Sequence, residues 1–227
     1  MPQHSKITAR PRPSCRLIMR QCDILICMNN NHIPPVLRPA SDHLQINPLI
    51  AGRWSSRAID THKPIDAAVL TRLFEAARWA PSAFNAQPWR FLSFGPESPK
   101  ALEEARKALL KGNVWALSAP RLLFLLAKNE KTGSPRTQYE AGMAAVQMAL
   151  QAAEEGLVFH QMIGFSADAV RTSFSVPDDF SIITAIAIGW PGSIGTVPEN
   201  RRNLETSERV RKSLDELVFS DGAVPKE

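Results

Sequence analysis

Three short segments of the sequence combine residue types that can bind an anionic or polar ligand. The first is Arg53-Trp54-Ser55-Ser56-Arg57. Alternate side chains of an extended segment point the same way, so Arg53, Ser55 and Arg57 are expected to share one side. Two guanidinium groups beside a hydroxyl suit the oxygens of a phosphate or a polarised carbonyl. The alternative, for this segment taken alone, is a basic turn exposed to solvent.

The second segment is the loop Pro81–Trp89, which reads Pro-Ser-Ala-Phe-Asn-Ala-Gln-Pro-Trp. It follows an expected helix and precedes an expected strand, as binding loops on rigid scaffolds do. The side-chain amides of Asn85 and Gln87 carry both donors and acceptors, which matches a heterocycle edge that alternates C=O and N–H. The two prolines restrict the loop, and Trp89 is expected to anchor it in the core. The alternative is a proline-rich connection with turn-forming polar residues.

The third segment is Arg209-Val210-Arg211-Lys212, close to the C-terminus. Alternation again aligns Arg209 with Arg211, and the three cations together could hold a dianionic phosphate. Because most runs of charge are solvated surfaces, that is the alternative for this segment alone.

Motifs for several other chemistries are missing from the sequence. There is no GxGxxG after an expected strand, no GxxxxGK[ST] and no GxSxG, so a Rossmann dinucleotide fold, a P-loop and a hydrolase elbow are not indicated. The five histidines form no HExxH or HxH pair, and only His160 lies well inside the regular part. A single histidine at the end of an apolar strand is more often structural than a ligand, so no metal site is expected. If the chain is an enzyme, a bound cofactor is expected to supply the reactivity.

Helices and short strands alternate around these segments. Thr137-Gln138-Tyr139-Glu140 has capping-box spacing and is expected to start a long helix rich in Ala, Met and Gln. Such a helix packs closely on most sides, so it should be central to the fold or to a dimer interface. Helical spacing and capping residues predict four helices: Asp66–Ala80, Ser98-Pro99 to just before Gly112, Thr137 to Gly156, and Ser166 to just before Pro177.

Four strands are expected between and after these helices. The second and fourth are nearly continuous apolar runs, as in strands covered on both faces. Helices should therefore flank a small central sheet. The strands are expected over Arg90–Phe94, Arg121–Ala127, Leu157–Ile163 and Ile182–Ile188.

Length and composition indicate one globular domain of ordinary type, with 227 residues of which 44% are hydrophobic and 22% charged. Residues 1–57 hold eight basic and two acidic residues, a net charge of +6, whereas the remainder holds 19 basic and 20 acidic residues, a net charge of −1. A nucleic-acid binder should carry its basic surface on the folded domain, so nucleic-acid binding is not expected. No apolar run approaches the roughly 20 residues of a membrane span, so a soluble protein with no membrane partner is expected.

The basic residues and the cysteines mark a domain boundary. Residues 1–46 are expected to form a basic, disordered N-terminal extension and extended arm, and residues 47–227 one ligand-binding domain. All three cysteines precede residue 28, which argues against a disulfide framework and is compatible with a cytoplasmic protein. One alternative is that Met28 is the true start. Peptides of the endogenous protein from upstream of Met28 would contradict that alternative.

The segments together resemble the nitroreductase family of flavin enzymes, over roughly residues 47–218. RWSSR followed by Ala-Ile-Asp is similar to the family's Arg-x-Ser-x-Arg/Lys opening motif, and APSAFNAQPWRF is similar to its most specific signature. The resemblance implies an α+β nitroreductase-like fold with a small mixed or antiparallel sheet flanked by helices, in a homodimer with C-terminal exchange. Three further stretches follow in the family's order: Glu154-Glu155-Gly156-Leu157 with Ile163-Gly164-Phe165, Ala187-Ile188-Gly189-Trp190-Pro191, and Arg211–Val218.

The resemblance also implies that FMN binds at the dimer interface. A cation at Arg57 would lie near flavin N1 and O2, where it stabilises the negative charge left by two-electron reduction. The residues that the resemblance assigns to the cofactor come from four parts of the chain: Arg53, Trp54, Ser55 and Arg57; Pro81, Ser82, Asn85 and Gln87; Ile163 and Gly164; and Arg209 and Arg211.

Within that assignment each part of the chain has its own role. Arg53 and Ser55 would contact the ribityl–phosphate or pyrimidine side, and Arg209 and Arg211 the phosphate. The backbone of Ile163–Gly164 would face flavin N5 and O4. Pro81 and Ser82 would shape a loop whose Asn85 and Gln87 meet the ring or the other half of the dimer.

The implied reaction is ping-pong. NADPH or NADH reduces the flavin and leaves, and a nitroaromatic, a quinone or a similar electron-poor acceptor then collects the electrons on the same face. No side chain is assigned a catalytic role, because flavin N5 carries the chemistry. Ile163 stands where some family members carry an acidic residue, so positioning of the nicotinamide through that side chain is not expected here. The segment around residues 112–137 is compact and offers few residues to enclose a substrate, so acceptor preference is expected to be loose or unusual.

Three other readings stay open at this point. The protein could bind FMN with little turnover, or it could be a flavin enzyme of the same fold with a different acceptor. It could also be an adaptor whose basic leader binds acidic surfaces, which unchanged behaviour of a chain starting at Met28 would exclude.

Overall fold

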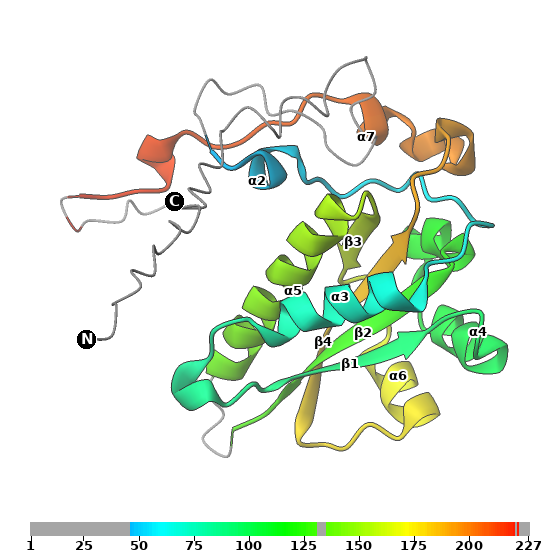
Figure 1. Cartoon of the computed structure of the whole chain (residues 1–227), viewed down its shortest axis with the longest axis horizontal. Coiled ribbons are helices and arrows are strands. Elements are labelled where there is room, and N and C mark those ends of the chain that lie inside the picture. The colour runs from blue at the N-terminus through cyan, green and yellow to red at the C-terminus, as the bar shows by residue number, and fades with distance from the viewer. Residues whose placement is uncertain (1–45, 131–134, 221, 223–227) are drawn as a thin grey trace, which may run out of the picture. The chain divides into compact units, whose positions relative to one another are not determined.

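The computed structural model of the chain describes residues 46–130, 135–220 and 222 (Figure 1). Residues 1–45 of the predicted extension lie outside the described residues. Three 3₁₀ helices bear on the candidate sites, namely η1 (Ala83–Asn85), η2 (Lys111–Ser118) and η4 (Glu199–Arg201). The helices are α2 (Pro48–Gly52), α3 (Ala67–Arg78), α4 (Pro99–Lys107), α5 (Arg136–Glu154), α6 (Ala167–Phe174) and α7 (Asn203–Thr206), and the strands are β1 (Trp89–Phe94), β2 (Arg121–Lys128), β3 (Val158–Met162) and β4 (Phe180–Gly189).

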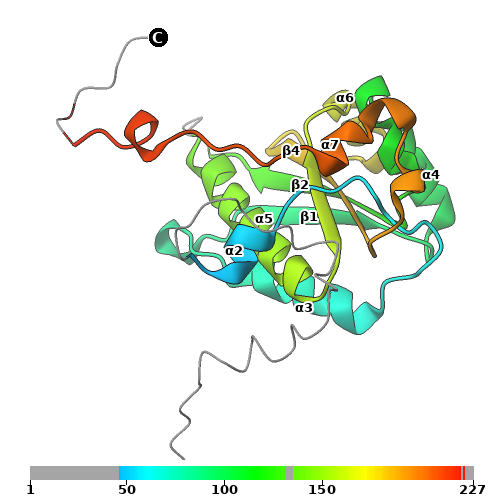
Figure 2. The same cartoon turned by 90° about the horizontal axis from the view of Figure 1, so that it is seen from above.

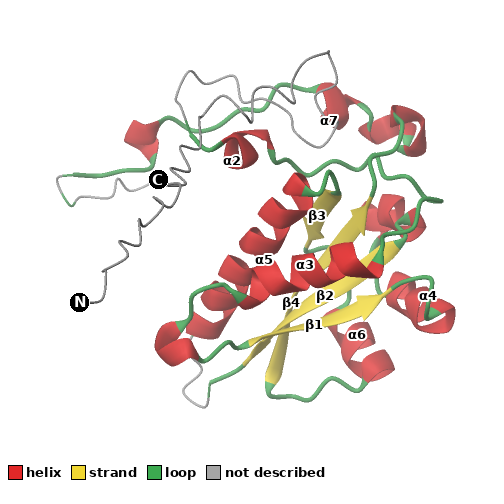
Figure 3. Ribbon diagram, viewed as in Figure 1, coloured by secondary structure: helices red, strands yellow, loops and turns green. Residues whose placement is uncertain are grey.

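The four strands form one antiparallel sheet in the order β1-β2-β4-β3 (Figure 3). The apolar strands β2 and β4 take the two central positions, which is why β2 is buried along nearly its whole length. All four predicted strands are confirmed, each to within two residues at either end. The expected α+β architecture with helices around a small sheet is also confirmed.

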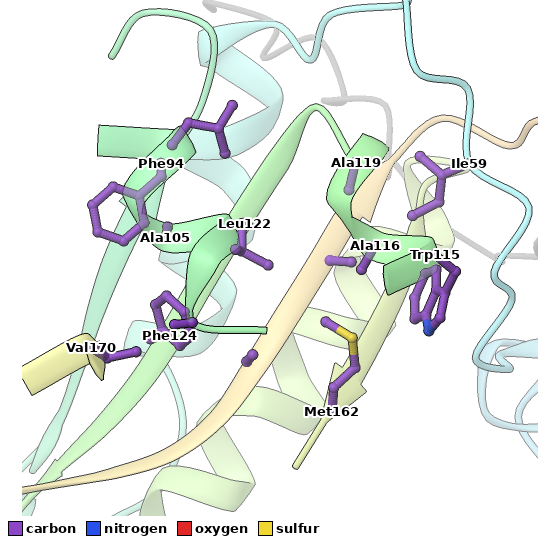
Figure 4. Close-up of a cluster of buried hydrophobic side chains, with 14 of the residues drawn as sticks. Ile59, Phe94, Ala105, Trp115, Ala116, Ala119, Leu122, Phe124, Met162 and Val170 are labelled. Carbon is purple, nitrogen blue, oxygen red and sulfur yellow. The ribbon is translucent and has the colours of Figure 1, made fainter. Parts of the chain in front are cut away.

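Helices cover both faces of the sheet (Figure 2). Because successive strand residues point to opposite faces, Leu123 and Phe159 pack in a cluster with α3 and α5. Phe124 and Met162 belong to the cluster on the other face, which includes Trp115 of η2 (Figure 4). Each face of the sheet thus has its own core. Within the described ranges no helix is long and apolar enough to cross a membrane.

Helix α5 is the central helix that its composition predicts. Small residues such as Ala141 and Ala145 are fully buried along it and let α3 and the sheet approach closely. Gly156 ends the helix with a left-handed φ of +76°, and its N–H donates to the Ala153 carbonyl while Leu157 N–H donates to that of Ala152. This is the Schellman arrangement, so the predicted termination at Gly156 is confirmed. The predicted cap at Ser166 is confirmed as well, because its hydroxyl accepts from Ala169 N–H.

Two predicted helix boundaries are wrong. The capping box at Thr137 is not formed, since Pro135 already has helical backbone angles and the helix begins at Arg136. Thr137 is therefore buried inside the first turn. The helix predicted from Ser98 to just before Gly112 stops at Lys107. Beyond it, Leu109 pairs with Phe165 in an isolated β-bridge. Backbone N–H and C=O groups that are hydrogen-bonded across this bridge are not available to continue the helix.

Candidate functional site

A pocket of about 510 Å³ lies where α2, α5 and the C-terminal segment meet. Figures 1 and 2 show that the chain around α2 and the segment that follows α7 lie side by side there. We call this the arginine pocket. Its polar residues come from both ends of the described chain and from β3, and its apolar wall comes from α2 and α5: Arg53, Ser55, Arg209, Arg211 and Gln161, with Ile50, Val146, Ala149 and Leu150.

Arg209 joins the two chain segments that form the arginine pocket. Its Nη1 donates to the carbonyl oxygen of Ala51 at 2.7 Å, and its Nη2 donates to that of Arg53 at 3.1 Å. These carbonyls lie at the end of α2, where helix carbonyls have no partner within the helix. The pocket therefore depends on contacts between residues more than 150 positions apart in the sequence.

Positive charge is concentrated in the arginine pocket. Burial, and then the positive charge of Arg211, lower the pKa of the Arg53 guanidinium below its usual value. The group stays charged, because an arginine side chain does not lose its proton in proteins. Like charges held together in a partly buried space are unfavourable unless an anion balances them. Of the residues predicted to bind the cofactor, the structure thus brings Arg53, Ser55, Arg209 and Arg211 together.

The side chain of Arg57 pairs with Glu205 and does not line the arginine pocket. Its Nη1 lies 3.6 Å from Glu205 Oε1, which also accepts a hydrogen bond from Arg57 N–H at 3.0 Å. The other carboxylate oxygen accepts from Ser56 Oγ at 2.8 Å. Glu205 is only 9% exposed, so a buried carboxylate from the C-terminal part of the chain fixes the segment Ser56–Arg57.

His160 holds the same segment from the sheet side. Its Nδ1 lies 2.9 Å from the carbonyl oxygen of Ser56, which can only accept, so Nδ1 carries the proton and donates. The imidazole packs 4.5 Å from the ring of Trp115, and the guanidinium of Arg57 lies 5.8 Å from that ring. Burial, more than the nearby charge of Arg57, lowers the pKa of His160 to about 4. The imidazole is therefore neutral at neutral pH and acts as a structural donor.

The loop between α3 and β1 holds an unusual backbone conformation. Phe84, Asn85 and Gln87 have φ values of +53°, +55° and +45°, a region that non-glycine residues rarely adopt. The Gln87 amide donates to Asn85 Oδ1 at 3.0 Å, and Ser82 Oγ accepts from Gln87 N–H at 3.0 Å. Trp89 is buried in the core, as predicted. Strained conformations of this kind concentrate at ligand-binding sites.

Glu140 attaches this loop to the start of α5. Its Oε1 accepts from Ala83 N–H at 2.8 Å, and the residue is only 2% exposed. Its Oε2 is buried and has no hydrogen-bond partner among the described residues. The loop with Pro81, Asn85 and Gln87 therefore lies near the N-terminal end of α5 (Figure 1). The arginine pocket is lined by residues of the same helix nearer its C-terminal end, from Val146 to Leu150.

A tight turn at Ile163–Gly164 follows β3. The Gly164 carbonyl accepts from Leu110 N–H at 3.0 Å and from Asn113 Nδ2 at 2.9 Å. A Cβ at Gly164 would lie 2.6 Å from Asn113 Nδ2, so a larger residue here would displace the Asn113 amide from this contact. Ile163 is 88% exposed, which leaves the apolar side chain at the edge of the site.

No sequence pattern marks Glu140 or Glu205 as a buried carboxylate. Glu140 stands in a segment with capping-box spacing, and Glu205 lies in a stretch with no motif. A lone acidic residue carries no signal of its burial or of a partner far away in the chain. In the described ranges no group of three or more His, Cys, Asp or Glu residues could hold a metal ion.

The chain belongs to the nitroreductase family. The family model matches residues 50–190, which include RWSSR, the strained loop and the Ile163–Gly164 turn. The fold and the family together define an oxidoreductase of this class.

Three proteins that the chain is similar to share between 25% and 30% sequence identity with it. A crystal structure of an oxidoreductase containing FMN superimposes with a TM-score of 0.74 at 30% identity, covering 83% of this chain and 97% of that one. A Thermus thermophilus protein named NADH dehydrogenase is 28% identical over 178 residues, which cover 63% of this chain and 84% of that protein. The 5,6-dimethylbenzimidazole synthase of Rhodospirillum rubrum is 25% identical over 166 residues, or 61% of this chain and 79% of that enzyme.

Replacing Glu205 should destabilise the fold. Glu205→Ala leaves the Ser56 hydroxyl and the Arg57 N–H without their buried acceptor, so we expect the free energy of unfolding in urea to fall by about 2–4 kcal/mol. Glu208→Ala, at an exposed position nearby, is the matched control and should change it by less than about 0.5 kcal/mol. Equal effects of the two substitutions would show that the buried carboxylate does not support this segment.

His160 should make stability depend on pH. Its folded-state pKa of about 4 lies below the ordinary value of 6.5, so the unfolded chain binds a proton first as the pH falls. Its contribution is therefore complete above about pH 6.5 and is lost between pH 6.5 and 4, a difference of roughly 3 kcal/mol.

The comparison of wild type with His160→Asn isolates this contribution, because other carboxylates titrate in both proteins. Between pH 7 and pH 4.5 the free energy of unfolding should fall by roughly 2–3 kcal/mol more in the wild type. His62→Asn, at an exposed position, should behave as the wild type does. Parallel pH profiles for wild type and His160→Asn would contradict a neutral buried imidazole.

Proposed function

We propose that this protein is an FMN-dependent oxidoreductase that uses NADPH or NADH to reduce nitroaromatic, quinone or similar electron-poor acceptors. The observation that carries this proposal is the arginine pocket, where Arg53 and Arg211 place like charges in a partly buried space. A doubly charged phosphate is the natural counter-ion for such a cluster. Membership of the nitroreductase family and the relative that contains FMN support the same cofactor.

The residues that line the pocket fit FMN in charge and polarity. Three arginines supply donors for the phosphate, and Ser55 and Gln161 offer polar partners to a polyhydroxylated chain. Val146 and Leu150 provide an apolar wall. The volume of about 510 Å³ falls within the roughly 300–1,000 Å³ usual for small-ligand sites.

The segment next to the pocket would then serve the ring. When bound, FMN accepts a hydride from the reduced coenzyme and passes electrons to the acceptor in a second, ping-pong step. In this proposal Arg57, held by Glu205, offers positive charge to the N1 and O2 end of the flavin. Trp54, which stands between Arg53 and Arg57 in the sequence, is also assigned to the cofactor. The Ile163–Gly164 backbone would face N5 and O4 of the bound flavin. No side chain takes a catalytic role, and one site receives the coenzyme and the acceptor in turn.

We further propose that residues 47–227 work as a homodimer with exchanged C-terminal segments. Pro81, Ser82, Asn85 and Gln87 lie toward the other end of α5 from their own pocket, so a second copy would supply them. A second copy would also cover large apolar side chains that one chain exposes: Ile50, Phe84, Tyr139, Val146, Leu214, Leu217 and Val218. A cytoplasmic location suits a chain whose three cysteines all precede residue 28.

Removing one arginine of the pocket should weaken FMN binding. Arg211→Met deletes a charge-assisted contact to the phosphate, so we expect the Kd of the flavin-free protein for FMN to rise roughly 10- to 100-fold in a fluorescence titration. Lys212→Met removes the same charge from the next residue, which does not line the pocket, and should change the Kd little. The phosphate assignment fails if both variants bind FMN as the wild type does.

Reduction by the coenzyme tests the enzymatic part of the proposal. Under anaerobic conditions, NADPH or NADH mixed with the FMN-loaded protein should bleach the flavin absorbance in a stopped-flow experiment, and a quinone should restore it. No bleaching by either coenzyme would favour an FMN-binding protein with little turnover. Bleaching followed by no reaction with quinones or nitroaromatics would favour a different acceptor, and the Rhodospirillum rubrum relative carries the name of a different activity.

A further inference from the structure

A second pocket, of about 440 Å³, lies between η2 and the turn η4. Lys111 and Trp115 line it from η2, and Pro198, Asn200 and Arg201 line it from the other side. We call it the Lys111 pocket. None of these residues belongs to the cofactor site predicted from the sequence.

Neither cation of the Lys111 pocket has an acidic partner among the residues that the structure describes. In the described part of the chain neither Lys111 nor Arg201 forms an ion pair, whereas nine other basic side chains, such as Arg72 with Glu155, do. The guanidinium of Arg201 lies beside η2, because a Cβ built on Gly112 would be in ordinary contact with Arg201 Nη2, at 4.0 Å. Two uncompensated cations around one hollow favour an anionic ligand.

The Lys111 pocket is connected to the candidate flavin site by direct contacts. Leu110 N–H and Asn113 Nδ2, on either side of Lys111, both donate to the carbonyl of Gly164. That carbonyl belongs to the turn proposed to face flavin N5. Trp115, which lines the pocket, lies 5.8 Å from the guanidinium of Arg57. A ligand in this pocket would therefore be a neighbour of the ring proposed for the flavin site.

We propose that Lys111 and Arg201 bind a phosphate group of the reducing dinucleotide while its nicotinamide lies at the flavin. This inference rests on the proposed function. Of the two substrates that function requires, quinones and nitroaromatics need carry no charge, whereas the dinucleotide is always anionic and is long enough to extend beyond the ring. Its diphosphate bridge and the 2′-phosphate of NADPH present the same chemistry to two cations, and Asn200 adds an amide donor beside them.

Calorimetric titration of the FMN-saturated full chain with adenosine 2′,5′-bisphosphate and with ADP tests the pocket without electron transfer. The double variant Lys111→Met/Arg201→Met should bind at least one of these nucleotides roughly tenfold more weakly than the wild type, or worse. Lys100→Met, which removes one exposed lysine of α4 outside the pocket, is the control for loss of positive charge elsewhere and should bind as the wild type does. Selective loss of the bisphosphate assigns the pocket to the 2′-phosphate, and equal loss of both nucleotides assigns it to the diphosphate.

The inference is overturned if the wild type binds neither nucleotide, or if the double variant binds both as tightly as the wild type. Kinetics separate this failure from that of the proposed function. If the coenzyme bleaches the wild-type flavin, the double variant should raise the KM for that coenzyme at least tenfold with kcat little changed, and an unchanged KM refutes the pocket alone. If no bleaching occurs but the nucleotides bind through Lys111 and Arg201, the proposed reductase activity is refuted while the phosphate pocket stands.

Discussion

The candidate site depends on the hydrogen bonds from Arg209 to the carbonyl oxygens of Ala51 and Arg53. These bonds bring the C-terminal segment to the end of α2, and only there can Arg211 approach Arg53. The resulting repulsion is a cost to the folded protein, since like charges in a partly buried space oppose each other. A site that stores such a cost is suited to an anionic cofactor, because binding relieves it.

Buried carboxylates fix the two segments of the candidate site that do not line the arginine pocket. Glu205 accepts two hydrogen bonds from the segment Ser56–Arg57, and Glu140 accepts one from the strained loop at Ala83. Both are shielded from water, so each bond is costly to break without replacement. The two segments are thereby held in defined positions before any ligand arrives, which reduces the ordering that binding must impose.

Local signals in the sequence were sufficient for most of the fold. The apolar runs of β2 and β4, Gly156 after α5 and the cap at Ser166 each depend on neighbours within a few residues. The end of α4 could not be predicted in this way, because the bridge between Leu109 and Phe165 joins parts of the chain far apart in sequence.

The same distinction between local signals and long-range contacts applies to the residues of the candidate site. Residue types and spacing indicated Arg53, Ser55, Arg209 and Arg211, which the structure places around one pocket. Alternation alone also predicted that Arg57 would share their side, but a carboxylate 148 residues away draws its side chain elsewhere. A pairing of this kind becomes visible only once tertiary structure sets burial and distance.

The junction held by Arg209 also has a consequence for biosynthesis. Its two halves are separated by 158 positions, so the ribosome completes the second long after the first. The sheet and α5 are synthesised in between and can begin to fold while the C-terminal half of the arginine pocket is still missing. If FMN binds as proposed, the nascent chain would acquire it only after residue 211 has been synthesised.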